Sequence, residues 1–144
     1  MRDFHLRFCL DRGWYDGLID LLNEEGDEDQ LPETGGAYVL GTSWTMLTYP
    51  WGTSPIFYIG KASNLRDRVV QHKRSILNAR ENHDEYFWPR YQYGAAFGAH
   101  VAWYSRRGPE NPQNVEAHLI EKFYESFGAI PTANSNWPSR IRPQ

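Results

Sequence analysis

The chain has 144 residues, of which 40% are hydrophobic and 15% aromatic, so it can form one domain with a buried core and is not composed like a disordered protein. No stretch approaches the roughly 20 apolar residues that span a bilayer, and no signal peptide is recognisable at the N-terminus. Cys9 is the only cysteine, which excludes an internal disulfide and a cysteine-based zinc site, and we expect a cytoplasmic protein.

The formal net charge of −3 hides an asymmetry along the chain. Residues 1–35 contain ten acidic and three basic side chains, whereas residues 36–144 contain eight acidic and twelve basic ones. Between Tyr58 and Arg80 there are six basic residues and a single acid, Asp67. Because charges are screened beyond about 8–10 Å, such a basic stretch can bind phosphates even in an acidic protein. It is equally compatible with a solvated helix face.

The N-terminal residues 1–35 are expected to form an acidic accessory segment, followed by the main domain over residues 36–144. Apolar residues recur at helical spacing in this segment, so we predict a short amphipathic helix over residues 14–25 that Gly26 ends. The acidic run 27–33 is predicted to be a linker or a cover over an active cleft. The apolar residues of the helix are Trp14, Leu18, Leu21 and Leu22.

Three segments have the composition of buried strands, namely residues 37–40, 56–59 and 100–104. The connection over residues 41–55 is too long for a tight turn and is predicted to be a decorated hairpin. The aromatic stretch 84–93 is predicted to be irregular because Pro89 breaks regular structure.

Two helices are predicted between and after these strands. Ser63 or Asn64 can cap the first, which we expect to run to about Asn78, and Asn114 can cap the second, over residues 115–127, with a stop at Gly128. The first helix has an apolar face at a period of 3.6 residues. That face consists of Leu65, Val69, His72 and Ile76.

Arg68 and His72 lie four residues apart on the first predicted helix, so their side chains are neighbours. Arginine offers a planar fork of donors that suits phosphate oxygens, and histidine can transfer a proton near neutral pH. The alternative is that His72 is a satisfied core histidine and Arg68 a surface cation.

Glu116 shares a helical stripe with apolar residues of the second helix, so its carboxylate is expected to face the packed side. A buried unpaired acid is costly, and a divalent metal ion would be a suitable partner. The alternative is that Glu116 lies in the first turn and stabilises the helix dipole.

Tyr38 and Tyr58 lie in two predicted strands and are more often core aromatics than catalysts. Lys61 follows Tyr58 by three residues. A nearby cation favours the phenolate, which would let a tyrosine act as a general base towards water.

A resemblance to a known family rests on several strings. The most specific is Tyr58-Ile59-Gly60-Lys61-Ala62-Ser63-Asn64-Leu65-Arg66-Asp67-Arg68, preceded by Gly36-Ala37-Tyr38 and followed by Val115-Glu116-Ala117-His118-Leu119-Ile120 and Pro131-Thr132-Ala133-Asn134. Over residues 36–134 the chain resembles the GIY-YIG nuclease superfamily, with alanine in place of isoleucine in the first triplet. The resemblance implies an α/β (α+β) fold with a three-stranded antiparallel sheet flanked by helices, here with an N-terminal helical extension.

The same resemblance implies hydrolysis of a phosphodiester bond with one divalent metal ion, Mg²⁺ or Mn²⁺. Glu116 would bind the metal and Arg68 the scissile phosphate. One of the two tyrosines, assisted by the lysine, would activate water, the histidine would support the phosphate or a proton transfer, and the asparagine would brace the site. The catalytic residues implied are Tyr38, Tyr58, Lys61, Arg68, His72, Glu116 and Asn134.

We therefore expect a divalent-metal-dependent endonuclease that acts on DNA rather than RNA and has no membrane partner. A homodimer or a complex with a partner protein is compatible with this expectation. A catalytically inactive nucleic-acid-binding or assembly module with the same fold is the alternative, and a protein-interaction domain is a third reading. Basic and aromatic side chains are expected to contact the nucleic acid. These are Lys61, Arg66, Lys73, Arg74, Trp51, Trp88 and Arg90.

Overall fold

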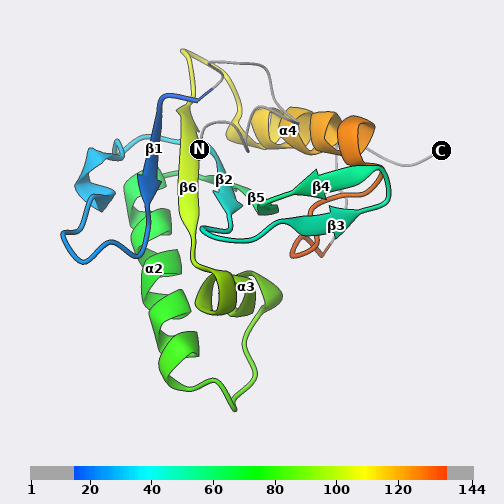
Figure 1. The fold of residues 1–144 in the computed structure, drawn as a ribbon. Coiled ribbons are helices and arrows are strands. Elements are labelled where there is room, and N and C mark those ends of the chain that lie inside the picture. The colour runs from blue at the N-terminus through cyan, green and yellow to red at the C-terminus, as the bar shows by residue number, and fades with distance from the viewer. Residues whose placement is uncertain (1–14, 136–144) are drawn as a thin grey trace.

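The computed structural model describes residues 15–135 and shows a mixed α/β fold (Figure 1). A four-stranded antiparallel sheet in the order β1-β6-β2-β5 has helices α2 and α3 on one face and α4 on the other. Its strands are β1 (Gly17–Asp20), β2 (Gly36–Gly41), β5 (Ile56–Ala62) and β6 (His100–Ser105). The helices are α2 (Leu65–Glu81), α3 (Pro89–Phe97) and α4 (Pro112–Phe127), with a short 3-10 turn η1 (Glu28–Gln30).

Strand β2 lies at the centre of the sheet, and all six of its residues are buried. Because side chains alternate along a strand, Tyr38 and Leu40 pack against the α2 and α3 face, whereas Ala37 and Val39 pack against α4. The central strand therefore places Tyr38 under α2, while β5 remains an edge strand.

The helix predicted over residues 14–25 is wrong for the described part, because β1 (Gly17–Asp20) pairs with β6 and a turn follows it. Ile19 and Leu21 are both buried, which is the two-residue period of a strand. Gly17 lies directly under the ring of Trp103, where a side chain would collide with it. The sheet consequently has four strands instead of three, and Trp14 lies outside the described residues.

The irregular structure predicted for residues 84–93 is also wrong from Pro89 onwards, because Pro89 is the first residue of α3. Proline lacks a backbone N–H, and at the first position of a helix that donor has no intrahelical partner anyway. Proline also holds the residue before it in an extended conformation, which is where Trp88 lies at φ −57° and ψ 144°.

The two other helices agree with the sequence except at their ends. Asn64 caps α2 by accepting a hydrogen bond from the backbone N–H of Asp67, and the predicted apolar face is buried. The cap of α4 is Asn111 instead of Asn114, and the helix ends at Gly128 in the left-handed conformation, at φ 79°.

The connection between β2 and β5 forms the predicted hairpin extension, with β3 (Leu47–Tyr49) paired to β4 (Gly52–Ser54). Its turn packs on the end of α4, where the backbone N–H of Trp51 donates to the carbonyl of Phe127 at 3.1 Å. Among residues 15–135, no helix combines the length and the apolar character that a membrane span requires.

Candidate active site

A buried cluster under α2 contains Tyr38, His72 and Arg68. The Tyr38 hydroxyl lies 2.5 Å from Nε2 of His72, and both side chains are fully buried. The guanidinium of Arg68 interacts with the Tyr38 hydroxyl on one side and donates to Oε1 of Gln71 at 2.7 Å. Arg68 and His72 are neighbours on α2, as their four-residue spacing predicted, and both contact Tyr38, which the sequence did not predict.

Both buried rings in this cluster are neutral at physiological pH. Burial raises the pKa of Tyr38 above its ordinary value. Burial, reinforced by the charges of Arg68 and Arg90, lowers the pKa of His72 to about 3. Tyr38 is therefore a hydrogen-bonding brace for Arg68 and not a base with access to water, whereas the half-buried Tyr58 reaches solvent.

Lys61 and Glu116 form a second cluster. Nζ of Lys61 lies 3.7 Å from Oε1 of Glu116, with 47% and 12% of the two side chains exposed. Burial raises the pKa of Glu116, and Lys61 opposes that shift. Because α4 begins at Pro112, Glu116 lies beyond the first turn, so the helix-dipole alternative loses its basis.

The sequence analysis expected Lys61 to lie beside Tyr58, and this prediction is wrong. Residues three apart on a strand point to opposite faces, and Lys61 points to the α4 face while Tyr58 packs with the α2 cluster. The two clusters accordingly lie on opposite faces of the sheet, and no ion pair or hydrogen bond joins Glu116 to Arg68 within the described residues.

The edge strand β5 contacts both clusters at successive residues. The Tyr38 hydroxyl lies over Gly60, since a Cβ built on Gly60 would be 2.5 Å from that oxygen. Lys61 is the next residue of the same strand and carries the ion pair with Glu116. Adjacent residues of one edge strand thus connect the buried tyrosine on one face with the acid on the other.

Asn134 covers the outer edge of β5 just before this point. Its Oδ1 accepts from the backbone N–H of Ile59 at 3.0 Å, and its Nδ2 donates to the carbonyl of Ile59 at 2.9 Å. The backbone N–H of Ala133 also donates to the carbonyl of Phe57, at 2.8 Å. Asn134 therefore occupies the place of a neighbouring strand and fixes the backbone next to Gly60.

A basic hollow of about 670 Å³ begins where β5 ends. It runs from Ala62 along α2 and is bordered by Arg66, Arg68 and Arg74. Arg68 therefore contacts the buried tyrosine on its inner side and the open hollow on its outer side.

No family model, curated protein or solved structure matches the chain. The resemblance found in the sequence accordingly stays a prediction.

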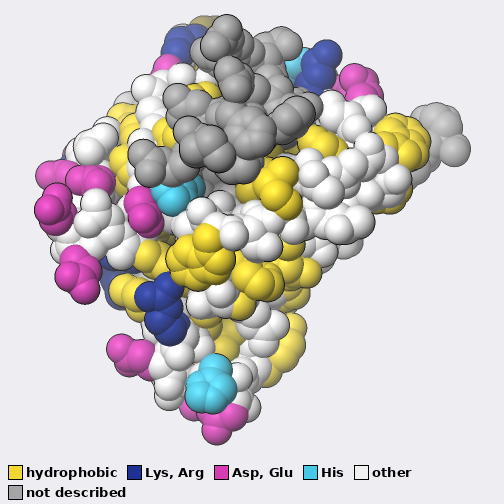
Figure 2. Space-filling model, viewed as in Figure 1, with side chains coloured by type: hydrophobic (Ala, Val, Ile, Leu, Met, Phe, Trp, Pro, Cys, Tyr) yellow, Lys and Arg dark blue, Asp and Glu magenta, His cyan; other side chains and the backbone are white. Residues whose placement is uncertain are grey.

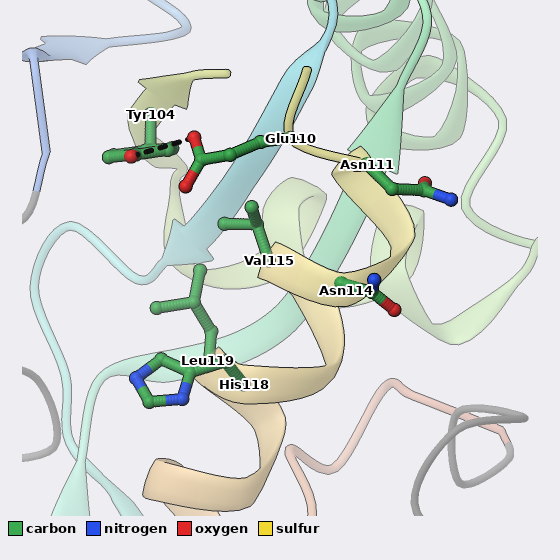
Figure 3. A pocket seen from close by; sticks show the side chains of 7 residues that line it. All are labelled: Tyr104, Glu110, Asn111, Asn114, Val115, His118 and Leu119. Carbon is green, nitrogen blue, oxygen red and sulfur yellow. Dashed lines mark hydrogen bonds between the residues drawn. The ribbon is translucent and has the colours of Figure 1, made fainter. Parts of the chain in front are cut away.

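A second hollow, of about 440 Å³, lies between α4 and the end of β6 (Figure 3). The Tyr104 hydroxyl donates to Glu110 at its rim, and Val115 and Leu119 form its apolar wall. None of the residues predicted for the active site lines this hollow. The basic hollow along α2 is therefore the one that concerns the predicted chemistry.

The acidic segment 27–33 is held against α2 and is not a free linker. Glu28 accepts two hydrogen bonds from Nζ of Lys73, at 2.9 and 3.1 Å. Arg66 donates to the carbonyls of Asp29 and Leu31, and Leu31 is fully buried. Figure 2 shows the acidic side chains gathered along one edge of the molecule, over this part of the chain. Two cations predicted to contact nucleic acid are thus already engaged.

The resemblance implies binding of DNA, and on that expectation the replacement of Glu28 by glutamine should release Lys73 and increase the affinity for DNA. One additional free cation should steepen the plot of log affinity against log salt by about 0.9. Titration of a labelled duplex at several salt concentrations measures both quantities. Deletion of residues 1–33 is a poorer test, because it removes Leu21 and Leu31 from the core.

The control for this experiment is Glu24→Gln, which changes the net charge equally at an exposed position of the same region. Equal affinity and equal salt dependence of the Glu28→Gln and Glu24→Gln proteins would show that the contact with Lys73 does not restrain DNA binding.

Trp51, Trp88 and Arg90 were all predicted to contact the nucleic acid, but Trp51 lies in a different part of the structure from the other two. Arg90 lies 5.2 Å from the ring centroid of Tyr58 and 5.4 Å from that of Trp88. Trp51 instead packs beside Gly128 at the far end of α4, about 18 Å along the helix from Glu116. Trp88 and Arg90 therefore adjoin the candidate site and Trp51 does not.

Tyr91 was missed in the sequence analysis although its ring contacts the site. Tyr91 is buried, and the centroid of its ring lies 5.6 Å from that of His72. It also interacts with Arg68. The signal was Pro89, because a helix that begins there turns Tyr91 inwards towards α2.

The pH dependence of stability is expected to report on His72. The pKa of this histidine is 6.5 in the unfolded chain and about 3 in the folded chain, so between these values the unfolded chain binds a proton that the folded chain does not bind. Stability should therefore fall as the pH decreases through this window, by about 2 kcal/mol at pH 5. Denaturant unfolding at pH 7 and pH 5 measures the loss.

In the His72→Gln protein this part of the pH dependence should disappear, whereas His118→Gln, at an exposed position of α4, should keep it. A His72→Gln protein that loses as much stability as the wild type between pH 7 and pH 5 would contradict the burial of a neutral imidazole.

Proposed function

We propose that the chain is a divalent-metal-dependent endonuclease that hydrolyses phosphodiester bonds in nucleic acid, DNA in preference to RNA. The observation that carries the proposal is the position of Arg68. Its guanidinium is held by Tyr38 on its inner side and faces the basic hollow, which begins at Ala62, the residue after Lys61 on β5. A phosphate in this hollow would meet Arg68, and the ion pair of Lys61 and Glu116 begins at the next residue of the same strand, on the other face of the sheet.

The residues present fit a magnesium or manganese ion held by one carboxylate. Glu116 is a half-buried acid whose only ion-pair partner among residues 15–135 is the exposed Lys61, and burial disfavours its charged form. Magnesium is commonly held by one or two carboxylates with water and substrate phosphate as further ligands. When bound there, the ion would supply Lewis-acid stabilisation of the charge that develops on the phosphate.

The roles of the protein residues follow from their access to solvent. Arg68 would hold the scissile phosphate through its planar fork of donors and stabilise the charge that grows on it. Tyr58 is the tyrosine that reaches solvent; in its phenolate form it would position the attacking water and accept its proton, which converts it to the neutral phenol. Tyr38 and His72 would keep Arg68 in place from inside the core.

A catalytically inactive nucleic-acid-binding module is the second candidate. The observation in its favour is that Arg68 and Glu116 lie on opposite faces of the sheet without contact among the described residues. In this case the basic hollow would bind phosphates and no bond would be broken.

A cleavage assay separates the two candidates. Labelled single-stranded, duplex and branched DNA and the matching RNA are incubated with Mg²⁺, Mn²⁺ or EDTA, and products are resolved by length. Nicks in DNA that need the metal ion and are absent with EDTA are expected. DNA that is bound but stays intact under every metal condition would refute the nuclease and favour the binding module.

A further inference from the structure

The aromatic residues before α3 form a surface that leads out from the candidate site. Tyr86 and Trp88 are exposed, by 78% and 54%. The guanidinium of Arg90 lies 5.2 Å from the ring centroid of Tyr58, 5.4 Å from that of Trp88 and 5.0 Å from that of Tyr91. A continuous run of rings and one cation thus connects the solvent-accessible tyrosine of the site with an exposed indole.

The backbone under this indole is firmly held. The carbonyl of Trp88 accepts from the backbone N–H groups of Tyr91 and Gln92, at 2.9 and 3.2 Å. Pro89 restricts Trp88 to an extended conformation, and Tyr91 is anchored in the core against His72. A large ring that is presented by a fixed backbone loses little conformational freedom when a ligand stacks on it.

The charge beside the indole is not neutralised. Within residues 15–135 no acid forms an ion pair with Arg90, and its buried Nε has no hydrogen-bond partner there. An uncompensated guanidinium next to an exposed ring matches a nucleotide, whose base can stack while its phosphate takes the charge. The bases of an uninterrupted duplex have no free face, so only an unpaired base can stack in this way.

We propose that Trp88 stacks on an unpaired base next to the phosphate held by Arg68 and Arg90, so that the preferred substrate has a single-stranded stretch at the cleavage point. This inference rests on the proposed nuclease function and specifies its substrate class. Arg90 then contributes to positioning the phosphate, and Tyr58 lies between that phosphate and the core.

The test is a binding assay with three DNA probes of one sequence: a continuous duplex, the same duplex with a three-nucleotide bulge, and the single strand. It is carried out in EDTA, so that binding is measured without cleavage. The wild-type protein is expected to bind the bulged duplex about tenfold more tightly than the continuous one. Trp88→Ala should remove this preference, and Trp88→Phe should restore most of it.

The matched control is Trp44→Ala, another exposed tryptophan, at 66%, which packs beside Gly98 at the opposite end of α3. It should keep the preference for the bulged probe. Equal affinity of the wild-type protein for the bulged and the continuous duplex would overturn the inference. An equal loss on both probes in Trp88→Ala would do the same.

Cleavage of the same three probes in Mg²⁺ keeps the two proposals apart. A protein that prefers the bulged probe but cuts none supports the stacking surface and refutes the nuclease. A protein that cuts the continuous duplex as well as the bulged one supports the nuclease and refutes the substrate class.

Discussion

Replacing Glu116 by glutamine is expected to lower the rate of DNA cleavage on the order of a thousandfold while the melting temperature stays equal or rises. Burial raises the pKa of Glu116, so at neutral pH the folded state bears a cost for keeping this carboxylate charged. Glutamine has nearly the same shape and no charge, and it removes that cost. Lys61, which is left without its partner, is half exposed and remains solvated.

A loss of activity together with an equal or higher stability is the behaviour of a residue kept for function at the expense of the fold. A purely structural acid would behave in the opposite way, because its removal would destabilise the protein and leave cleavage intact. Thermal unfolding and the cleavage assay on the same preparation measure both quantities.

The control is Glu121→Gln, an exposed glutamate of the same helix, which should change neither activity nor stability. Binding of DNA in EDTA should also persist in the Glu116→Gln protein, since Arg68 and Arg74 still border the basic hollow. Full cleavage by Glu116→Gln would refute the assignment of this carboxylate to the metal ion.

The parts of the fold that the sequence predicted well are those that local pattern determines. Helix α2 has an asparagine cap and an apolar face with a helical period. Each of these signals depends only on residues that are close together in the sequence. The neighbourhood of Arg68 and His72 follows from the helix alone, and both reach Tyr38 as a consequence. Local geometry was therefore enough for one half of the candidate site.

The parts that the sequence did not predict depend on contacts between distant segments. Strand β1 forms because the edge of β6 offers hydrogen bonds to residues 17–20. The spacing of the leucines in this segment also fits a helix, so the local pattern alone did not distinguish the two structures. The engagement of Lys73 by Glu28 joins positions 45 residues apart. No local pattern indicates such a pairing, so Lys73 was expected to be free to contact phosphates. The same holds for Arg66, which donates to the carbonyls of Asp29 and Leu31.

The face to which Lys61 points is a different case, because the information was present. The alternation of side chains along a strand places Tyr58 and Lys61 on opposite faces of β5. Applied consistently, it separates the lysine from the tyrosine and leaves it free to pair with an acid of a helix on the other face, which is Glu116.

Gly60→Ala is expected to impair both the fold and the activity. A methyl group on Gly60 would lie 2.5 Å from the Tyr38 hydroxyl, 2.6 Å from Cζ of the same ring and 2.8 Å from Cε2 of Tyr58. Tyr38 is fully buried and bonded to His72, so its ring cannot move away without disturbing α2. Overpacking of this kind costs about 1–3 kcal/mol, which denaturant unfolding measures.

The loss of activity should exceed what the loss of stability explains. A displaced Tyr38 also displaces Arg68, and a shift of about 1 Å in a group that positions the substrate can slow a reaction roughly a hundredfold. The cleavage rate is therefore measured at a temperature at which the variant is fully folded.

Gly41→Ala is the matched control, because a methyl group there meets only Pro55, at an ordinary distance of 3.6 Å, and Gly41 lies on the same strand as Tyr38. It should fold and cut like the wild type. A folded Gly60→Ala protein with wild-type cleavage would mean that the close contact between Tyr38 and Gly60 does not set the position of Arg68. The link between the buried cluster and the strand edge would then be refuted, even if the chain cuts DNA.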